Sequence, residues 1–421
     1  MAVTPIERVK SAFVAGIWAT LVSISIGFGF KIWLAQWVVK SDLALYHTVV
    51  DIISMSLILM TGFRSSMVVS YSQTQNDKDI TNIFRYTLIA MVLLTWGIVL
   101  PYIKHELHLD VAYFHLVGII LGMGLKVYFA NQIAMYRMYH ISNKVTWMEP
   151  LGQVIAFGVT FYILNQTAIA SLFYSLMLSS LAVAGYMFVN RRKVIATTPL
   201  ASVNMTPSLK SFVQKSITSA LEAGAGLLMI YITVLLTIAH FSIDELGDFQ
   251  VVVRPMIAYL TLLFVFPIYR FVLPELAVCV REKQNEQVGL IKRWIYKIAI
   301  LVSISFFVLM LFAGQQVVDW VFPQTYSKAA PVLMHFSLFF VFMMLNAYQL
   351  AFIKAHGLFV QSLAIRLSGI VALVASYYFY TLFTDNVVAV VLALGSGYML
   401  MFILSSFVER RVVRQHQGQS V

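Results

Sequence analysis

Cationic side chains inside long apolar stretches are the residues of this sequence most able to do chemistry. They are Lys31, Arg64, Lys126, Arg254, Arg270 and Arg366. A charge in hydrocarbon is costly, so each is expected to face a counter-charge or a water-filled cavity. The acidic residues clearly within these stretches are few, Asp51 and Glu222, and Glu149 lies near the start of its stretch. The positive excess predicts a hydrated cavity that attracts an anion, and we interpret the cations, together with Asp51, as candidate substrate-binding residues.

Three of these residues lie at a similar depth. Lys31, Asp51 and Arg254 are each about eight residues from the outer end of their apolar stretch, or roughly 12 Å at 1.5 Å per residue. This spacing predicts one cluster, in which Asp51 pairs with one cation while the other binds the substrate. The alternative for Lys31 is a long side chain that extends to the outer interface.

The remaining cations differ in how readily a structural role explains them. Arg64 and Arg270 lie near the inner ends of their stretches, where extension to the interface is favoured over function. Lys126 lies nearest the middle of the membrane, where a functional role is the better explanation. For Arg366 both interpretations stay open.

Glu222 lies within the sequence EAGAG, beside Gly224 and Gly226, and glycines of this kind allow close helix approach. Its carboxyl group could bind a coupling proton or sodium ion, or it could be the partner of an arginine. Both alternatives stay open.

Amide and hydroxyl side chains in two other stretches could bond sugar hydroxyls or, equally, neighbouring helices. They are Asn131, Gln132, Asn346, Tyr348 and Gln349. The sequence contains neither the phosphate-binding motif GxxxxGK[ST] nor the catalytic motifs HExxH and GxSxG. We therefore expect no bound cofactor and no metal, and at most coupling to a H⁺ or Na⁺ gradient.

The elements that position these residues must span a membrane. Hydrophobic residues make up 60% of the 421 residues and charged residues only 11%, whereas soluble domains average about 25% charged residues. The formal net charge of +11 lies in short loops between apolar stretches, which argues against nucleic-acid binding. One cysteine, Cys279, excludes an internal disulfide and a cysteine-based metal cluster.

Hydropathy predicts twelve spans, all helical because a lipid-exposed strand cannot satisfy its backbone hydrogen bonds. The predicted spans are 12–38, 43–70, 82–103, 111–136, 145–164, 168–189, 212–239, 246–272, 290–312, 329–353, 358–382 and 386–407. Alternate connections contain nearly all loop Lys and Arg, Lys354 among them, whereas the opposite set contains Lys40, Lys104 and Lys328. By the positive-inside rule both termini are expected in the cytoplasm.

The longest hydrophilic connection divides the spans into two equal groups. We predict an N-terminal six-helix bundle at 1–195, a cytoplasmic linker at 196–210 and a C-terminal six-helix bundle at 211–421. A short repeat is consistent with two halves, because Asp42–Asp51 (DLALYHTVVD) aligns with Glu245–Arg254 (ELGDFQVVVR).

The stretch 244–284 resembles a known family of transporters. The residues that carry the resemblance are Asp244-Glu245-Leu246-Gly247, Phe249-Gln250, Leu273-Pro274-Glu275-Leu276 and Arg281-Glu282-Lys283. They are similar to those of the O-antigen (Wzx-type) and enterobacterial common antigen flippases of the multidrug/oligosaccharidyl-lipid/polysaccharide (MOP) exporter superfamily. Asp248 and Arg254-Pro255 depart from the family pattern and leave the exact substrate open.

The resemblance implies a V-shaped pair of six-helix bundles, as in MATE transporters, around a cationic cavity. It implies alternating access that moves an undecaprenyl-pyrophosphate-linked oligosaccharide from the cytoplasmic to the periplasmic leaflet of the bacterial inner membrane. The polymerase and chain-length regulator of the same surface-glycan (lipopolysaccharide O-antigen) pathway are expected partners. Arginine suits a pyrophosphate because its planar guanidinium donates paired hydrogen bonds.

Two other functions remain as alternatives. A MATE-like, ion-coupled exporter of small molecules would need buried carboxylates for cationic cargo, and few are present. A membrane glycan polymerase or ligase would need a sizeable outer loop to hold its active site, and every outer connection is short. The sequence therefore favours a transporter over an enzyme.

Overall fold

The structure is a computed structural model of the chain and describes residues 4–106, 113–192, 207–322, 326 and 328–418. Every element longer than a single turn in these ranges is helical. The first half contains α1 (Pro5–Trp37), α2 (Lys40–Ser56), α3 (Ile58–Thr74), α4 (Asp77–Leu94), η1 (Thr95–Val99), α5 (Leu100–Glu106), α6 (Tyr113–Met135), α7 (Tyr139–Gly158), η2 (Val159–Ile163) and α8 (Ala168–Arg192), where η marks a π-helical turn.

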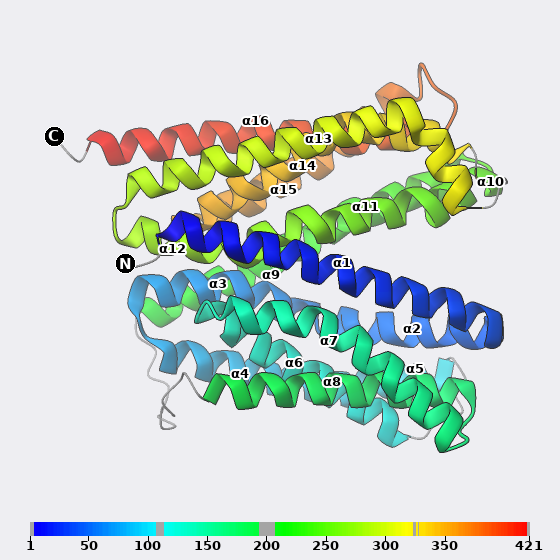
Figure 1. Cartoon of the computed structure of the whole chain (residues 1–421). Coiled ribbons are helices and arrows are strands. Elements are labelled where there is room, and N and C mark those ends of the chain that lie inside the picture. Colours follow the sequence, from blue (N-terminus) through cyan, green and yellow to red (C-terminus); the bar gives the residue numbers. More distant parts are fainter. Residues whose placement is uncertain (1–3, 107–112, 193–206, 323–325, 327, 419–421) are drawn as a thin grey trace. The chain divides into compact units, whose positions relative to one another are not determined.

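The second half contains the long helix α9, then a broken helix, and then four further long helices (Figure 1). Its elements are α9 (Pro207–His240), α10 (Ile243–Asp248), η3 (Phe249–Val253), α11 (Arg254–Leu260), η4 (Thr261–Val265), η5 (Ile268–Val272), α12 (Leu273–Arg281), α13 (Asn285–Val321), α14 (Ala329–Ala355), α15 (Phe359–Tyr380) and α16 (Val388–Gly418). The prediction of an all-α membrane protein is confirmed.

Ten helices in the described ranges are long and apolar enough to cross a membrane. They are Pro5–Leu34, Asp77–His105, Phe114–Met135, Ala168–Arg191, Leu209–His240, Glu245–Arg281, Asn285–Val321, Ala329–Ala355, Phe359–Tyr380 and Val388–Gln415. The other two predicted spans are helical as well: 43–70 consists of α2 and α3, which meet at Leu57, and 145–164 consists of the end of α7 with η2. The total of twelve membrane spans stays a prediction.

Backbone contacts divide the chain into two compact units. The N-terminal unit is Ser11–Ala220, and the C-terminal unit is Leu221–Val421 together with Met1–Lys10. Both α1 and α9 therefore contribute to both units. Most of the predicted linker, at 196–206, lies outside the described residues, and the predicted bundle limits stay a prediction.

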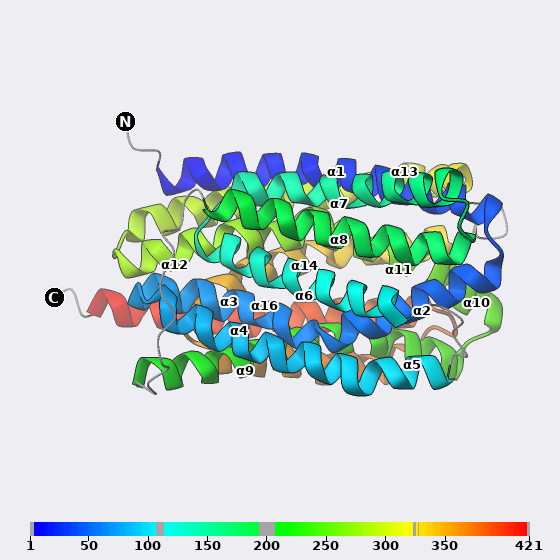
Figure 2. The same ribbon diagram turned by 90° about the horizontal axis from the view of Figure 1, so that it is seen from below.

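In the N-terminal unit, α6 lies beside α8 on one side and beside α3 and α4 on the other (Figure 2). Buried Leu116, Ile119 and Ile120 of α6 belong to the same apolar cluster as Leu172 and Phe173 of α8. Because α6 is packed between neighbours, a charged side chain on it needs a partner or water.

In the C-terminal unit, α14 is the central helix and packs against α12, α13, α15 and α16. It is buried along most of its length, and from Met343 to Ala355 every side chain is buried. A helix that is apolar all round is typical of such a core position.

The stretch 243–281 differs from the single span predicted at 246–272. A capping box formed by Ser242 and Glu245 starts α10, and three π-helical turns follow before α12 ends at Arg281. The prediction ended this span too early, because Arg270 and Glu275 lowered the hydropathy although Glu275 is fully buried. π-helical turns inside α-helices are frequent at functional sites.

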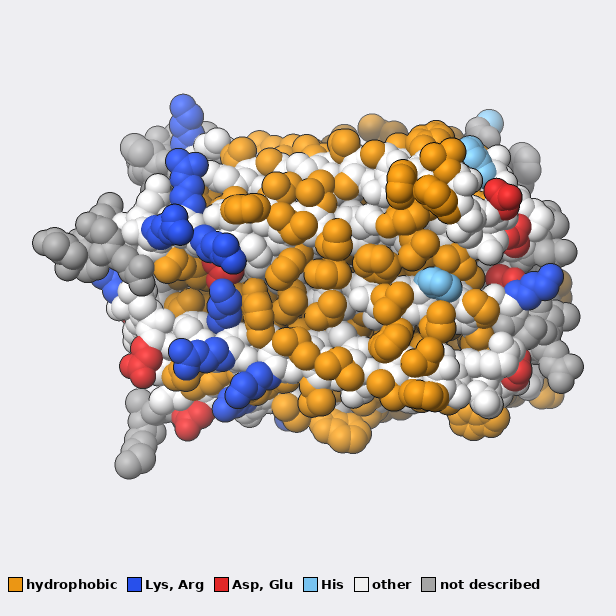
Figure 3. Space-filling model, turned by 90° about the horizontal axis from the view of Figure 1, so that it is seen from above, with side chains coloured by type: hydrophobic (Ala, Val, Ile, Leu, Met, Phe, Trp, Pro, Cys, Tyr) orange, Lys and Arg blue, Asp and Glu red, His pale blue; other side chains and the backbone are white. Residues whose placement is uncertain are grey.

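Charged side chains gather at the ends of the helices on the face in Figure 3. Lys and Arg side chains gather toward one end of this face with some acidic side chains among them, hydrophobic side chains cover its middle, and acidic side chains lie near the other end beside a Lys or Arg side chain. An apolar band between polar ends is what a bilayer requires of a membrane-spanning surface.

Candidate functional site

A buried carboxylate with two cationic partners lies inside the C-terminal unit. One carboxylate oxygen of Glu222 on α9 is 2.5 Å from Lys354 Nζ on α14, and the other is 3.6 Å from an Arg366 guanidinium nitrogen on α15. The exposed fractions of these side chains are 4% for Glu222, 6% for Lys354 and 14% for Arg366. We call Glu222, Lys354 and Arg366 the charge cluster.

The local sequence explains how three helices bring these groups together. Lys354 lies in the last turn of α14, and Gly357, with φ of 79°, reverses the chain into α15, which contains Arg366. A left-handed φ of this kind favours glycine. On α9, a Cβ at Gly226 would lie 3.7 Å from Arg366 Cζ, so the guanidinium packs closely over the helix at this glycine.

Tyr269 of η5 closes the charge cluster on another side. Lys354 Nζ lies 4.8 Å from the centre of its ring, and Arg366 hydrogen-bonds its hydroxyl group. With two cations and one carboxylate, the charge cluster carries a net charge of +1. Arg366 Nε is buried without a hydrogen-bond partner. A buried excess of positive charge with a free donor can bind an anion.

Of the two alternatives for Glu222, the structure supports the partner of an arginine, and it adds a lysine that the sequence prediction missed. The sequence predicts Lys354 in a loop, because a cation at the end of a helix is the usual pattern at an inner interface. That prediction is wrong, because Lys354 is buried in the last turn of α14. The sequence feature that could have indicated a buried Lys354 is the run of apolar and amide residues before it, NAYQLAFIK.

A second ion pair lies near the middle of α6 and α7 in the N-terminal unit. Lys126 Nζ is 2.5 Å from Glu149 Oε1, and the side chains are 22% and 30% exposed. One turn after Glu149, Gln153 Nε2 donates to the hydroxyl of the buried Tyr46 on α2 at 2.8 Å. Lys126 therefore has the counter-charge that its mid-membrane position requires.

Lys31 of α1 and Asp51 of α2 both belong to the N-terminal unit and have exposed side chains. His47, one turn before Asp51, interacts electrostatically with both. No ion pair joins Lys31 and Asp51 in the described part of this unit. Arg254 belongs to the C-terminal unit, so the predicted cluster of all three stays a prediction.

Arg64 and Arg254 have neutral partners. Arg64 of α3 is half-buried and interacts electrostatically with Tyr139, and its Nε has no hydrogen-bond partner. An Arg254 guanidinium nitrogen donates to Gln250 Oε1 at 2.9 Å, and its Cζ lies 5.8 Å from the centre of the Tyr231 ring. Among the described residues, neither arginine pairs with a carboxylate.

Arg270 of η5 is half-buried, and its Cζ lies 5.4 Å from the centre of the Phe271 ring. The predicted substrate-binding residues therefore lie in several separate surroundings within their units. Their shared role in binding stays a prediction.

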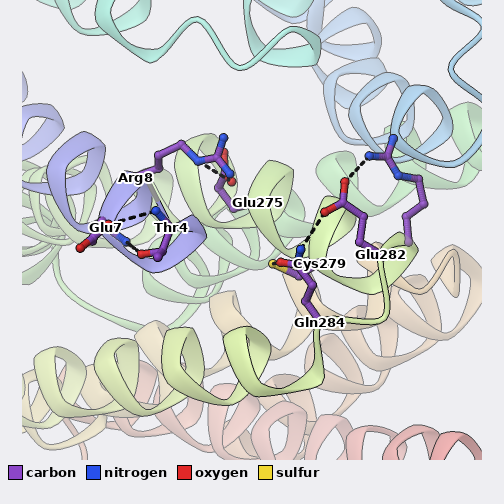
Figure 4. A network of polar contacts seen from close by, with 8 residues as sticks. Thr4, Glu7, Arg8, Glu275, Cys279, Glu282 and Gln284 are labelled. Atoms are coloured by element: carbon purple, nitrogen blue, oxygen red, sulfur yellow. Dashed lines mark hydrogen bonds and ion pairs between the residues drawn. The ribbon is translucent and has the colours of Figure 1, made fainter. Parts of the chain in front are cut away.

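A buried carboxylate that the span prediction left out is Glu275 in the motif Leu273-Pro274-Glu275-Leu276. Figure 4 shows it beside Arg8 of α1, with Arg8 Nε 3.5 Å from Glu275 Oε2. The Glu275 side chain is 0% exposed. Thr4 and Glu7 cap the first turn of α1, because the Thr4 backbone N–H donates to Glu7 Oε2 at 3.0 Å. Both partners of the Arg8–Glu275 pair belong to the C-terminal unit.

The candidate sugar-binding amides bond to neighbouring helices. Asn346 Nδ2 donates to the Tyr398 carbonyl at 2.6 Å, Gln349 Nε2 to Ser406 Oγ at 2.7 Å, and Asn131 Nδ2 to the Met60 carbonyl at 3.0 Å. Gln132 accepts a hydrogen bond from Arg191. Of the two alternatives given above, these contacts favour interhelical bonding. In the described ranges, no group of three His, Cys, Asp or Glu side chains could hold a metal ion.

Comparisons with known proteins define the fold class. No family model matches the chain, and no curated protein matches its sequence. Solved structures do match it over nearly its whole length. A crystal structure of MATE in the straight conformation superposes with a TM-score of 0.80 at 13% identity, covering 98% of this chain and 97% of that one.

Two further solved structures match the fold of this chain. An outward-facing multidrug resistance MATE family transporter of the MOP superfamily has a TM-score of 0.78 at 13% identity and covers 99% of each chain. A MOP superfamily transporter from Pyrococcus furiosus has a TM-score of 0.79 at 13% identity and covers 98% of this chain and 99% of its own. The chain is therefore a multi-pass membrane protein with the fold of MATE transporters.

Proposed function

We propose that this chain is a flippase that moves an undecaprenyl-pyrophosphate-linked oligosaccharide, such as an O-antigen repeat unit, from the cytoplasmic to the periplasmic leaflet by alternating access. The likeness to MATE and MOP transporters supports transport rather than catalysis. The resemblance of the stretch 244–284 to polysaccharide flippases supports the lipid-linked cargo. We place the chain in the bacterial inner membrane with both termini in the cytoplasm.

The observation that carries the proposal is the uncompensated positive charge inside the C-terminal unit. Lys354 and Arg366 share the single carboxylate of Glu222, and Arg254 has only neutral partners among the described residues. Buried cations without matching acids are costly unless an anion neutralises them during function. A pyrophosphate headgroup supplies that charge, while its polyprenyl tail can remain in the bilayer.

An ion-coupled exporter of small molecules is the second candidate. The fold likeness to a multidrug resistance transporter favours it. The charge cluster argues against cationic cargo, because its net charge of +1 repels cations. For the related P. furiosus structure, a reverse polarity of the binding pocket has been taken to suggest a different function, so the charge of the site is the informative feature.

Complementation of a bacterial strain that lacks its own O-antigen flippase tests the proposal. The parent chain is expected to restore surface glycan and to clear the lipid-linked oligosaccharides that mass spectrometry detects in the deletion strain. Arg254→Ala and Lys126→Ala should each lower surface glycan about tenfold, because a hydrogen bond to a charged group contributes roughly 1.5–3 kcal/mol. Lys297→Ala, at an exposed cation of α13, is the matched control.

Protein levels in the membrane must be equal for this comparison. Full export by both variants would contradict the role of these cations. Clearance of a cationic drug from the cells, without any restored glycan, would instead support the exporter.

A further inference from the structure

We propose that the charge cluster of Glu222, Lys354 and Arg366 is a binding site for a small inorganic anion of the size of chloride, which occupies it while no substrate is bound. The site exists whatever the cargo of the transporter is. One link joins it to the proposed function, because a pyrophosphate that binds the same cations has to displace the small anion.

The charge cluster holds more positive than negative charge. The two carboxylate oxygens of Glu222 face one cation each, Lys354 Nζ at 2.5 Å and an Arg366 guanidinium nitrogen at 3.6 Å. In the described part of the chain, neither cation forms an ion pair with a second carboxylate. A buried positive charge without a counter-ion is strongly unfavourable. An anion from solution supplies the counter-charge that the protein does not.

Arg366 also has a hydrogen-bond donor that the protein does not use. Its Nε atom is buried and has no hydrogen-bond partner. The guanidinium faces Glu222 with a terminal nitrogen and hydrogen-bonds the hydroxyl group of Tyr269, which brings no charge to the site. A buried donor without a partner is unfavourable, so this N–H group points to a ligand that accepts a hydrogen bond. Hydrogen bonds from a guanidinium to an anion are among the strong ones.

The surroundings of the charge cluster limit the anion to a small one. The exposed fractions of 4%, 6% and 14% leave these side chains little contact with solvent. The Tyr269 ring lies on one side, with its centre 4.8 Å from Lys354 Nζ, and the α9 backbone on another, since a Cβ at Gly226 would lie 3.7 Å from Arg366 Cζ. A monovalent halide matches the net charge and has no substituents. A lipid-linked pyrophosphate reaches such a site only when the helices around it move.

Other cations inside the helices do not combine these features. Lys126 has a carboxylate partner of its own in Glu149, so that pair is neutral. Arg64 also has an Nε atom without a hydrogen-bond partner, but it interacts electrostatically with the neutral Tyr139 and not with a second cation. A shared carboxylate, two buried cations and an unused donor occur together in the charge cluster, which is therefore the place for the anion.

Thermal unfolding in chloride tests the site without any substrate. The purified protein is unfolded in one detergent at constant ionic strength while chloride replaces gluconate, an anion too large for the site. A ligand of the folded state raises the midpoint with the logarithm of its concentration, so the parent chain should gain about 2–4 °C per tenfold increase above half-saturation. Arg366→Gln leaves a neutral pair and should lose this gain. The matched control is Arg293→Gln, at an exposed cation of α13, which should keep it.

Two further variants separate charge from hydrogen bonding. Arg366→Lys keeps the net charge and removes the Nε donor, so the half-saturating chloride concentration should rise about tenfold. Glu222→Gln removes the carboxylate that offsets one of the two cations, so the half-saturating concentration should fall about tenfold. If Glu222→Gln is not recovered from membranes, the order of the parent chain, Arg366→Lys and Arg366→Gln decides.

An equal gain in the parent chain and in Arg366→Gln would overturn the proposal, because chloride would then act at the protein surface only. The absence of any gain in the parent chain would also overturn it. Inorganic pyrophosphate tests the link to the proposed function, since chloride should stabilise the parent chain less when pyrophosphate is present. If the gain from chloride is the same with and without pyrophosphate, the small-anion site stands, and the charge cluster is not where the proposed cargo binds.

Discussion

At the scale of single residues, the carboxylate of Glu222 organises the charges of the C-terminal unit. It holds Lys354 and Arg366, which come from two different helices. Removal of one partner from a buried ion pair is more harmful than removal of the pair, because the remaining charge is desolvated and unmatched. Substitution of Glu222 should therefore destabilise the protein more than substitution of either cation.

This difference predicts an order of stability. Glu222→Gln leaves two buried cations without a counter-charge and should cost about 3 kcal/mol, since breaking buried pairs typically costs 3–5 kcal/mol. Lys354→Met leaves a one-to-one pair of Glu222 and Arg366 and should cost less. Thermal unfolding of the purified proteins in one detergent measures both. A lower midpoint for Lys354→Met than for Glu222→Gln would contradict the arrangement.

Charged residues inside helices could be identified from the sequence, whereas buried charges at helix ends could not. Lys126, Glu222 and Arg366 lie well inside their helices, and hydropathy alone marked them. Glu149 lies near the middle of α7, although hydropathy placed it near the start of its span. Lys354 and Glu275 lie at helix ends, where the sequence pattern is that of an interface. Their burial depends on which helices pack around them, and hydropathy does not contain that information.

At the scale of elements, close contacts between helices limit which side chains fit at the contact. Gly62 of α3 meets α9 so closely that a Cβ would lie 2.5 Å from Ala220 Cα, a backbone atom that cannot yield alone. Beside this contact, Ser219 Oγ donates to the Gly62 carbonyl at 2.8 Å, and Ser66 Oγ lies 2.7 Å from Ser216 Oγ. Small residues with interhelical hydrogen bonds are the usual means of helix association in membranes.

Gly62→Ala should therefore destabilise the N-terminal unit by about 1–3 kcal/mol, the typical result of overpacking. Gly27→Ala is the matched control, because a Cβ at Gly27 of α1 would meet nothing within 4 Å. Hydrogen exchange of α3 and α9 amides should rise in the first variant only. Equal exchange in both variants would show that the contact has no such role.

The helical elements were largely predictable and their interruptions were not. Pro255, Pro267 and Pro274 marked the stretch 243–281 as irregular, because proline removes a backbone donor. The π-helical turns at Phe249–Val253, Thr261–Val265 and Ile268–Val272 each end two residues before one of these prolines, and all three contact α14. The prolines therefore mark where the turns lie, although hydropathy alone does not predict their π-helical form.

At the scale of the whole molecule, the chain is built from helices that divide into two compact units, Ser11–Ala220 and Leu221–Val421 with Met1–Lys10. The all-helical class of the chain followed from hydropathy, whereas the total of twelve spans stays a prediction. The assignment of the first turns of α1 to the C-terminal unit was not predicted, because it reflects contacts with residues far away in the chain, and Arg8 of these turns pairs with Glu275.

The uneven distribution of Lys and Arg predicts the orientation of the chain. A fluorescent protein that folds only in the cytoplasm should be bright when fused after Val421. Cysteine labelling in a Cys279→Ala background should modify a cysteine at Lys283 only from the cytoplasmic side, and one at Lys328 only from the periplasmic side. The reverse pattern would contradict the predicted topology.

Flippase activity is tested most directly in liposomes that contain the purified chain and a polyprenyl-pyrophosphate-linked oligosaccharide in both leaflets. A membrane-impermeant glycosidase outside the liposomes reports how fast inner-leaflet glycan reaches the outer leaflet. With the parent chain, we expect nearly all the glycan to be cleaved, and slow cleavage of the inner fraction with Arg254→Ala. Cleavage by the parent chain that stops at the outer-leaflet fraction, as in protein-free liposomes, would contradict the proposed flippase function.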